Sequence, residues 1–153
     1  TIGAQIGGSL KNVMAIAVGI CRGGGMGASA EAALITRGYA ELVRLGVAMG
    51  ARPETLMGLS GLGDLILTCS STQSRNMSLG KAIGEGRTFK DIMAERNSVA
   101  EGAHTVEIVH KIAREKGLDM PITGAVYNIL KEGRDARTVM DELMARPFTS
   151  EHA

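Results

Sequence analysis

The sequence predicts an all-α fold, a bundle of several helices in one domain. Over most of its 153 residues, apolar side chains recur at intervals of three or four, which is the spacing of one helix face. No segment shows the sustained alternation of apolar and polar residues that marks a half-buried strand. Glycine and proline, which interrupt helices, stand between the periodic segments. Together these observations predict helices joined by turns, without a sheet.

The first two predicted helices are the longest. An apolar stripe precedes the cluster Gly23–Gly25, which is expected to end the first helix. The stripe consists of Ile6, Leu10, Val13, Ala17 and Ile20. The second helix is expected over Ala28–Met49, with Gly50 as its stop. On it, Arg37 and Glu41 are four residues apart, a spacing that predicts an ion pair along the helix surface.

Three shorter helices are expected in the middle of the chain. Pro53 is predicted to open the first of them, because proline is favourable at the first helical position, and this helix ends near Gly58. The other two are expected over Asp64–Cys69, as a buried helix, and over Ser74–Gly84.

Four further helices complete the predicted bundle. Thr88 is expected to cap a short helix over Thr88–Arg96, because its hydroxyl can accept a hydrogen bond from a free backbone N–H. The next helix is expected over Gly102–Lys116, where basic residues gather near the negative end of the helix. The last two are expected over Pro121–Lys131 and Asp135–Arg146.

Length and composition indicate one globular helical domain over residues 1–148, followed by a tail at 149–153. Hydrophobic residues make up 44% of the chain and charged residues 22%, an ordinary globular composition. Aromatic residues make up only 3%, whereas 21 residues are glycine. The core must therefore be filled by aliphatic side chains, and helices are expected to approach closely over small residues.

Charge and cysteine content bear on partners and location. The net charge is +1 and the basic residues are scattered, which argues against nucleic acid as a partner. No segment is continuously apolar enough for a membrane span. Cys21 and Cys69 stand among aliphatic residues and predict core positions in a reducing compartment, which indicates a cytoplasmic protein.

The glycine cluster contains an apparent nucleotide-binding motif. Residues 25–30 match the GxGxxA form of the dinucleotide fingerprint. That motif works after a strand, at the opening of a βαβ helix, where the backbone approaches a pyrophosphate. Here a predicted helix precedes it and no strand follows, so the segment is interpreted as a turn between two helices.

Two histidine motifs raise the question of a metal site. Glu101 and His104, like Glu107 and His110, have the three-residue spacing of di-iron helix bundles. Such a site requires the two motifs on different helices, whereas these lie on one, about 240° apart around its axis. No metal site is therefore predicted.

Lys11 is the single charge in the segment from Thr1 to Cys21. Gly7 and Gly8 lie one turn before it and leave open space beside its stem. The side chain could simply extend to solvent, as partly buried lysines often do. Alternatively, Lys11 exchanges a proton with a ligand, and Asn12 hydrogen-bonds to the same molecule.

The stretch GLSGLGDLILTCSSTQSRN, residues 58–76, has the residue types of a phosphate site. Asp64 and Thr68 are four residues apart and share a helix face. Ser74, Arg75 and Asn76 then open the next predicted helix, where free N–H groups, a guanidinium and an amide can hold a phosphate. The simpler interpretation is a capped helix with one solvated arginine.

Four segments, in their order and spacing, resemble the bacterial NAD(P)-dependent glycerol-3-phosphate dehydrogenase family. They are GGSLKNVMAIAVGI, AALITRGYAEL, GLSGLGDLILTCSSTQSRN and VAEG. The resemblance runs from Gly7 to Arg146 and covers the all-helical C-terminal substrate domain of the family, a fold like the C-terminal domain of 6-phosphogluconate dehydrogenase. It implies a partner in the enzyme's own N-terminal Rossmann domain, which this sequence lacks, so the fragment alone is expected to be inactive.

The resemblance also implies an activity and the residues that perform it. The family interconverts sn-glycerol 3-phosphate and dihydroxyacetone phosphate with NAD or NADP, for glycerophospholipid synthesis. Lys11 is expected to be catalytic, as the proton donor and acceptor. The residues expected to bind substrate are Lys11, Asn12, Asp64, Thr68, Ser74, Arg75 and Asn76. The residues expected to lie against the nucleotide are Arg75, Val99 and Glu101.

Two alternative functions remain open at this point. The chain could be the helical domain of a related 3-hydroxyacid or 6-phosphogluconate-type dehydrogenase, although the phosphate-site residues favour glycerol phosphate over a carboxylated substrate. It could also be a non-catalytic helical module for dimerisation, since many glycines and few aromatics suit close helix packing. A homodimer is compatible with either function.

Overall fold

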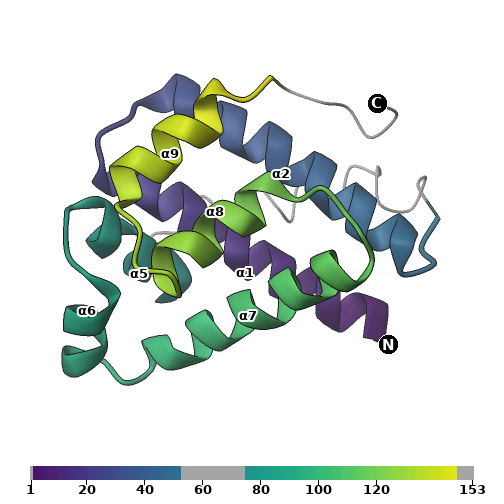
Figure 1. The fold of residues 1–153 in the computed structure, drawn as a ribbon, viewed down its shortest axis with the longest axis horizontal. Helices are drawn as coiled ribbons and strands as arrows, with labels where there is room; N and C mark the ends of the chain where they lie inside the picture. Colours follow the sequence, from purple (N-terminus) through teal and green to yellow (C-terminus); the bar gives the residue numbers. More distant parts are fainter. Residues whose placement is uncertain (1, 53–74, 148–153) are drawn as a thin grey trace.

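The computed structural model describes residues 2–52 and 75–147, and all regular secondary structure in these two ranges is helical (Figure 1). The all-α prediction is therefore confirmed for the described part of the chain. The helices are α1 (Ile2–Gly23), α2 (Ala28–Ala48), α5 (Arg75–Gly84), α6 (Phe89–Glu95), α7 (Val99–Glu115), α8 (Pro121–Leu130) and α9 (Ala136–Ala145).

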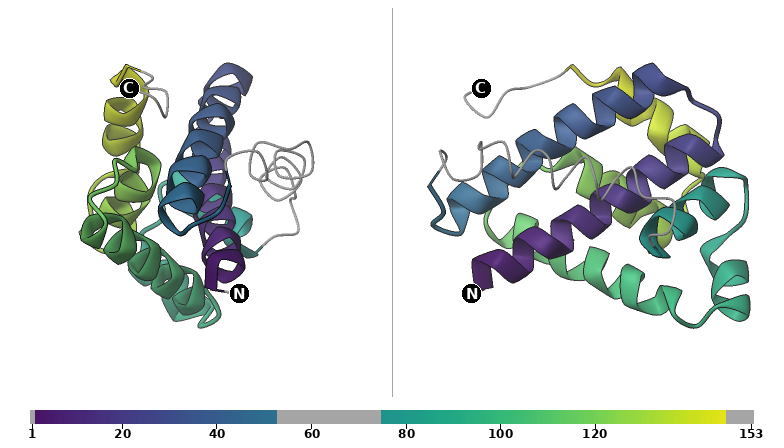
Figure 2. Two further views of the ribbon diagram at one scale, coloured as in Figure 1. Left: turned by 90° about the vertical axis from the view of Figure 1, so that its right-hand side faces the viewer. Right: turned by 180° about the vertical axis from the view of Figure 1, so that it is seen from behind.

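Helix α1 is the centre of the fold, in contact with α2, α5, α7 and α8. Every residue from Val13 to Cys21 is buried. A helix that is covered on all sides must be apolar on all sides, and this segment carries no charge between Lys11 and Arg22. Seen edge-on in Figure 2, α1 and α2 lie in one layer and α8 and α9 in the other.

Local capping and turn predictions agree with the structure. The Thr88 hydroxyl accepts a hydrogen bond from the Asp91 N–H at 3.1 Å and caps α6. Asp135 caps α9 in the same way, through the Thr138 N–H at 2.9 Å. The glycine cluster is a turn between α1 and α2, in which Gly25 and Gly27 have positive φ values of 66° and 98° that favour glycine.

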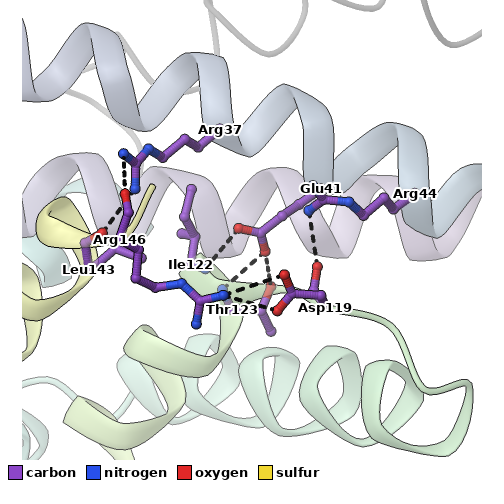
Figure 3. A network of polar contacts seen from close by, with 8 residues as sticks. All are labelled: Arg37, Glu41, Arg44, Asp119, Ile122, Thr123, Leu143 and Arg146. Atoms are coloured by element: carbon purple, nitrogen blue, oxygen red, sulfur yellow. Dashed lines mark hydrogen bonds and ion pairs between the residues drawn. The ribbon is translucent and has the colours of Figure 1, made fainter. Parts of the chain in front are cut away.

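Two sequence-based expectations about the helices are wrong. Helix α7 begins at Val99, one turn earlier than Gly102, because the glycine sits inside the helix rather than at its start. The Arg37 and Glu41 side chains do not form the expected pair along α2. Each binds the end of another helix, Arg37 at the end of α9 and Glu41 at the start of α8 (Figure 3).

Several remaining predictions can be compared with the structure only in part. Cys21 is buried with a free thiol, as expected for a core residue, and burial raises the pKa of this thiol. In the described ranges, no helix has the length and apolar character needed to cross a membrane. The helix expected at Pro53, the helix over Asp64–Cys69, Cys69 itself and the tail at 149–153 lie outside the described residues.

Candidate functional site

Six of the predicted site residues lie on three helices of the described structure. Lys11 and Asn12 are half-buried on α1, Arg75 and Asn76 open α5, and the first turn of α7 carries Val99 and Glu101. Asp64, Thr68 and Ser74 are outside the described residues. The position of the site therefore depends on how α1, α5 and α7 pack together.

Helices α1 and α5 lie in direct backbone contact over glycines. A Cβ atom added at Gly80 would collide with the Ile16 carbonyl oxygen, and one added at Gly19 would collide with the Met77 carbonyl oxygen. One turn further along both helices, a Cβ at Gly84 would collide with the Ile20 carbonyl oxygen. From the contact of Ile16 with Gly80 to that of Ile20 with Gly84, both helices advance by one turn, so α1 and α5 run parallel in a fixed register.

This register brings the two predicted substrate segments to the same level of the bundle. Gly80 lies against the turn of α1 from Ile16 to Ile20. Asn76 is one turn before Gly80, and is therefore level with the turn of α1 that begins at Asn12. Asn12 is on the same face of α1 as Ile16, and Asn76 is on the same face of α5 as Gly80. Lys11, which is next to Asn12, is thereby placed near the beginning of α5.

Among the described residues, nothing packs against α1 at the two glycines on the N-terminal side of Lys11. A Cβ added at Gly7 or Gly8 would have no heavy atom of the described residues within 4 Å, apart from its chain neighbours and its own helix backbone. Gly7 lies one turn before Lys11 on the same face of α1. In the described structure, the glycines therefore leave this part of the α1 surface uncovered.

Helix α7 meets the start of α5 at Asn76. A Cβ added at Gly102 would lie 2.6 Å from Asn76 Oδ1, so the amide is seated directly against α7. Glu101, next to Gly102, is exposed, whereas the Val99 side chain is buried in the core. The sequence pattern did not reveal the contact of Gly102, although a glycine within a helical pattern often marks a close approach.

The charges at this junction suit an anionic ligand. Arg75 is exposed at the first described position of α5, and the N-terminal end of a helix dipole favours negative charge. Lys11 contributes a second positive charge from α1, and Glu101 a negative one from α7. An arginine and the opening of a helix are the groups that proteins commonly use to bind phosphate.

One of the two histidine motifs, Glu107 with His110, contributes to the packing of α7 against α8. His110 stacks on Tyr127, with ring centroids 3.9 Å apart, and joins α7 to α8. Glu107 pairs with Lys131, which lowers the pKa of this carboxyl group. In the described ranges, no three His, Cys, Asp or Glu side chains come together in an arrangement that could hold a metal ion.

Comparison with known proteins identifies the family to which this chain belongs. The sequence model described as NAD-dependent glycerol-3-phosphate dehydrogenase C-terminus matches residues 1–141. Glycerol-3-phosphate dehydrogenase (NAD(P)+) from Erythrobacter litoralis is 59% identical over 150 residues, which are 98% of this chain and 45% of that protein. The same enzyme from Parvibaculum lavamentivorans is 58% identical over the same shares of both chains.

Solved structures agree with this comparison. The crystal structure of glycerol-3-phosphate dehydrogenase from Coxiella burnetii has a TM-score of 0.87 and 44% identity, over 95% of this chain and 45% of that one. The enzyme structure from Dunaliella salina, at 22% identity and a TM-score of 0.74, shares the fold. The fold is thus that of the helical domain of a nicotinamide-dependent dehydrogenase. The chain belongs to the family of NAD-dependent glycerol-3-phosphate dehydrogenase C-terminal domains and spans less than half the length of these relatives.

Proposed function

We propose that this chain supplies the substrate-binding and catalytic half of an enzyme that interconverts glycerol 3-phosphate and dihydroxyacetone phosphate with NAD or NADP. The observation that supports this proposal most directly is the packing of α5, which contacts both α1 and α7. Its first turn joins the segment that holds Lys11 to the segment that holds Glu101. The proposal includes a cytoplasmic location, a role in glycerophospholipid synthesis and a nucleotide-binding Rossmann domain as the other half of the site.

The start of α5 binds the phosphate group in this proposal. The Arg75 guanidinium offers two parallel N–H donors to phosphate oxygens, and the Asn76 amide offers another donor. Ser74 adds a hydroxyl, and the N-terminal end of the α5 dipole favours the negative charge of the phosphate. Binding of this non-reacting group fixes the rest of the small molecule in position, which is how remote binding energy lowers a reaction barrier.

In this proposal, Lys11 is the general acid and base that donates a proton to, or accepts one from, the C2 oxygen of the substrate. Reduction of the ketone develops negative charge on this oxygen, and the nearby ammonium group stabilises that charge and transfers a proton to it. In the reverse direction the amine accepts the hydroxyl proton. Asn12 hydrogen-bonds to the same oxygen or its neighbour, and Asp64 and Thr68 orient the remaining hydroxyl groups of the substrate.

The nicotinamide nucleotide lies against the first turn of α7 and against Arg75 of α5 in this proposal. The Glu101 carboxylate is exposed and can accept hydrogen bonds from ribose hydroxyls, and Arg75 can share its guanidinium between the two ligands. Val99 supports this turn from the core, where its side chain is buried. When bound, the nucleotide supplies or accepts a hydride at C4 of its nicotinamide ring.

The role of Lys11 is tested by Lys11→Met in the full gene product. Methionine keeps the length and apolar body of the side chain but removes the ammonium group, so turnover of dihydroxyacetone phosphate is expected to fall by about 10² to 10⁴, the range for a lost general acid. The affinity for NADH or NADPH, measured by fluorescence titration, is expected to stay unchanged. Lys111→Met is the matched control, because this α7 side chain is 77% exposed.

The outcomes separate the proposal from simpler explanations. Normal turnover of Lys11→Met would remove Lys11 from the mechanism. An equal loss of turnover in Lys111→Met would indicate a general effect of replacing lysine. Loss of nucleotide affinity together with turnover would indicate damage to the fold and would count against a specific role in proton transfer.

A further inference from the structure

Gly102 is buried on α7, and the part of α5 that lies closest to it is the Asn76 side chain. A Cβ added at Gly102 would lie 2.6 Å from Asn76 Oδ1 and 3.5 Å from Leu79 Cδ2. The second distance is an ordinary van der Waals contact, whereas the first is a collision. Among the described residues, a methyl group at position 102 would therefore overlap with the Asn76 amide and with little else.

This collision differs in kind from those between α1 and α5. At Gly80 and Gly84 the atoms in the way are backbone carbonyl oxygens, which can move only if a whole helix moves. At Gly102 the atom in the way is the tip of a side chain with two rotatable bonds. The protein can accept a methyl group there by rotating Asn76 away while α5 and α7 keep their places.

We propose that Gly102 is a positioning residue for the phosphate subsite, and that its missing side chain determines where the Asn76 amide lies. This inference rests on the proposed function, in which Asn76 holds the substrate phosphate. A hydrogen bond to a charged group is short and strongly directional. A displacement of the amide by the width of a methyl group removes this bond even though Asn76 itself is still present.

The proposal predicts a selective loss of substrate affinity in Gly102→Ala of the full gene product. The KM for glycerol 3-phosphate is expected to rise about tenfold or more, the loss of one hydrogen bond to a charged group. The Tm is expected to stay at or above that of the parent, because alanine is about 1 kcal/mol better than glycine inside a helix. Gly124→Ala is the matched control, since Gly124 lies inside α8 and a Cβ there would have no heavy atom of another described residue within 4 Å, apart from its chain neighbours and its own helix backbone.

A double-mutant cycle with Asn76→Ala distinguishes positioning from packing. If Gly102 acts through Asn76, Gly102→Ala has no further effect on KM once the amide has been removed. An additive rise in KM in the double variant would overturn the proposal, because Gly102 would then act by another route. A Gly102→Ala protein that fails to fold would also overturn it, since the collision would not be relieved by one side chain.

The failure of this inference can be told apart from a failure of the proposed function. If Asn76→Ala raises the KM for glycerol 3-phosphate and Gly102→Ala does not, the phosphate-binding role of Asn76 is supported and the positioning role of Gly102 is contradicted. If Asn76→Ala leaves the KM unchanged, Asn76 does not bind the phosphate, and the positioning role of Gly102 is contradicted as well. A rise for both single variants without additivity supports both.

Discussion

Thr123 donates two hydrogen bonds to the buried Glu41 carboxylate, from its backbone N–H and its hydroxyl, both to Oε1 at 3.2 Å (Figure 3). The Ile122 N–H donates to the other oxygen of the same group at 2.7 Å. Helix α8 begins with Pro121, and its own N-cap residue makes no side-chain hydrogen bond. Glu41 of α2 therefore caps α8 from another helix and satisfies N–H groups that the helix itself leaves unpaired.

The environment of Glu41 predicts a dependence of stability on pH. Burial raises the pKa of this carboxyl group from its ordinary value of 4.5 to about 7, against the opposing effect of its hydrogen bonds and of Arg44. Between these two pH values the folded chain holds a proton that the unfolded chain has released. The free energy of unfolding is therefore expected to decrease as pH rises from 4.5 to 7, by about 3 kcal/mol at most.

Urea denaturation at a series of pH values measures this effect, and Glu41→Gln isolates it. Glutamine has the same shape and does not titrate, so the decrease between pH 4.5 and 7 is expected to disappear from the variant. His110 serves as an internal contrast, because burial lowers its pKa and its contribution to stability therefore rises with pH. A Glu41→Gln variant with the full decrease would assign the pH dependence to another group.

The glycine contacts between α1 and α5 lead to a second prediction. Gly80→Ala is expected to destabilise the fold by about 1–3 kcal/mol or more, because the added methyl group must displace the Ile16 backbone rather than a side chain. It should also raise the KM for glycerol 3-phosphate, since the register that brings Asn76 to the level of Asn12 depends on this contact. Thermal unfolding and steady-state kinetics of the full gene product measure the two effects.

Gly124→Ala is the control for this experiment. Both glycines lie inside helices, but a Cβ at Gly124 would have open space among the described residues, so the substitution there is expected to be neutral or stabilising. Gly80→Ala with the stability and KM of the parent would show that α1 and α5 can separate without consequence. The proposed role of their register would then be wrong.

Features of the fold that depend on near neighbours in sequence were predictable. The helical period identified the helices of the described ranges, and Thr88 could be identified as a cap because it bonds to an N–H only three residues away. The pairing of Arg37 with Glu41 was wrong because the local rule considers one helix alone. An isolated helix offers these side chains only each other, whereas the folded chain offers the unpaired ends of α8 and α9.

The sequence indicated candidate site residues but not how they are arranged. Lys11 stood out because it is a charge in an apolar helix, and Arg75 because it follows a run of small polar residues. Their proximity depends on contacts such as that of Ile16 with Gly80, which are 64 positions apart in sequence and leave no periodic signal. The contact between Asn76 and Gly102 could not be predicted for the same reason, since a glycine in a helical pattern does not indicate which residue packs against it.

The last prediction concerns whether the positive charge at the start of α5 must be carried by a guanidinium group. Arg75 is exposed at the first position of this helix, and in the proposed function its guanidinium binds the substrate phosphate through two parallel N–H donors. Lysine keeps the positive charge but offers a single point of contact. Arg75→Lys is therefore expected to raise the KM for glycerol 3-phosphate by about tenfold, and Arg75→Ala by more, as charge and hydrogen bonds are lost together.

Arg114→Lys provides the comparison, because this arginine is also exposed but lies near the far end of α7. It is expected to leave the KM unchanged, which would show that the loss at position 75 does not come from replacing any surface arginine. Inorganic phosphate should compete with the substrate in the parent enzyme and lose potency in Arg75→Lys by a similar factor, since it occupies the same group of donors. Equal inhibition of the two proteins by phosphate would place the phosphate-binding group elsewhere and leave Arg75 as a solvated residue at the start of a helix.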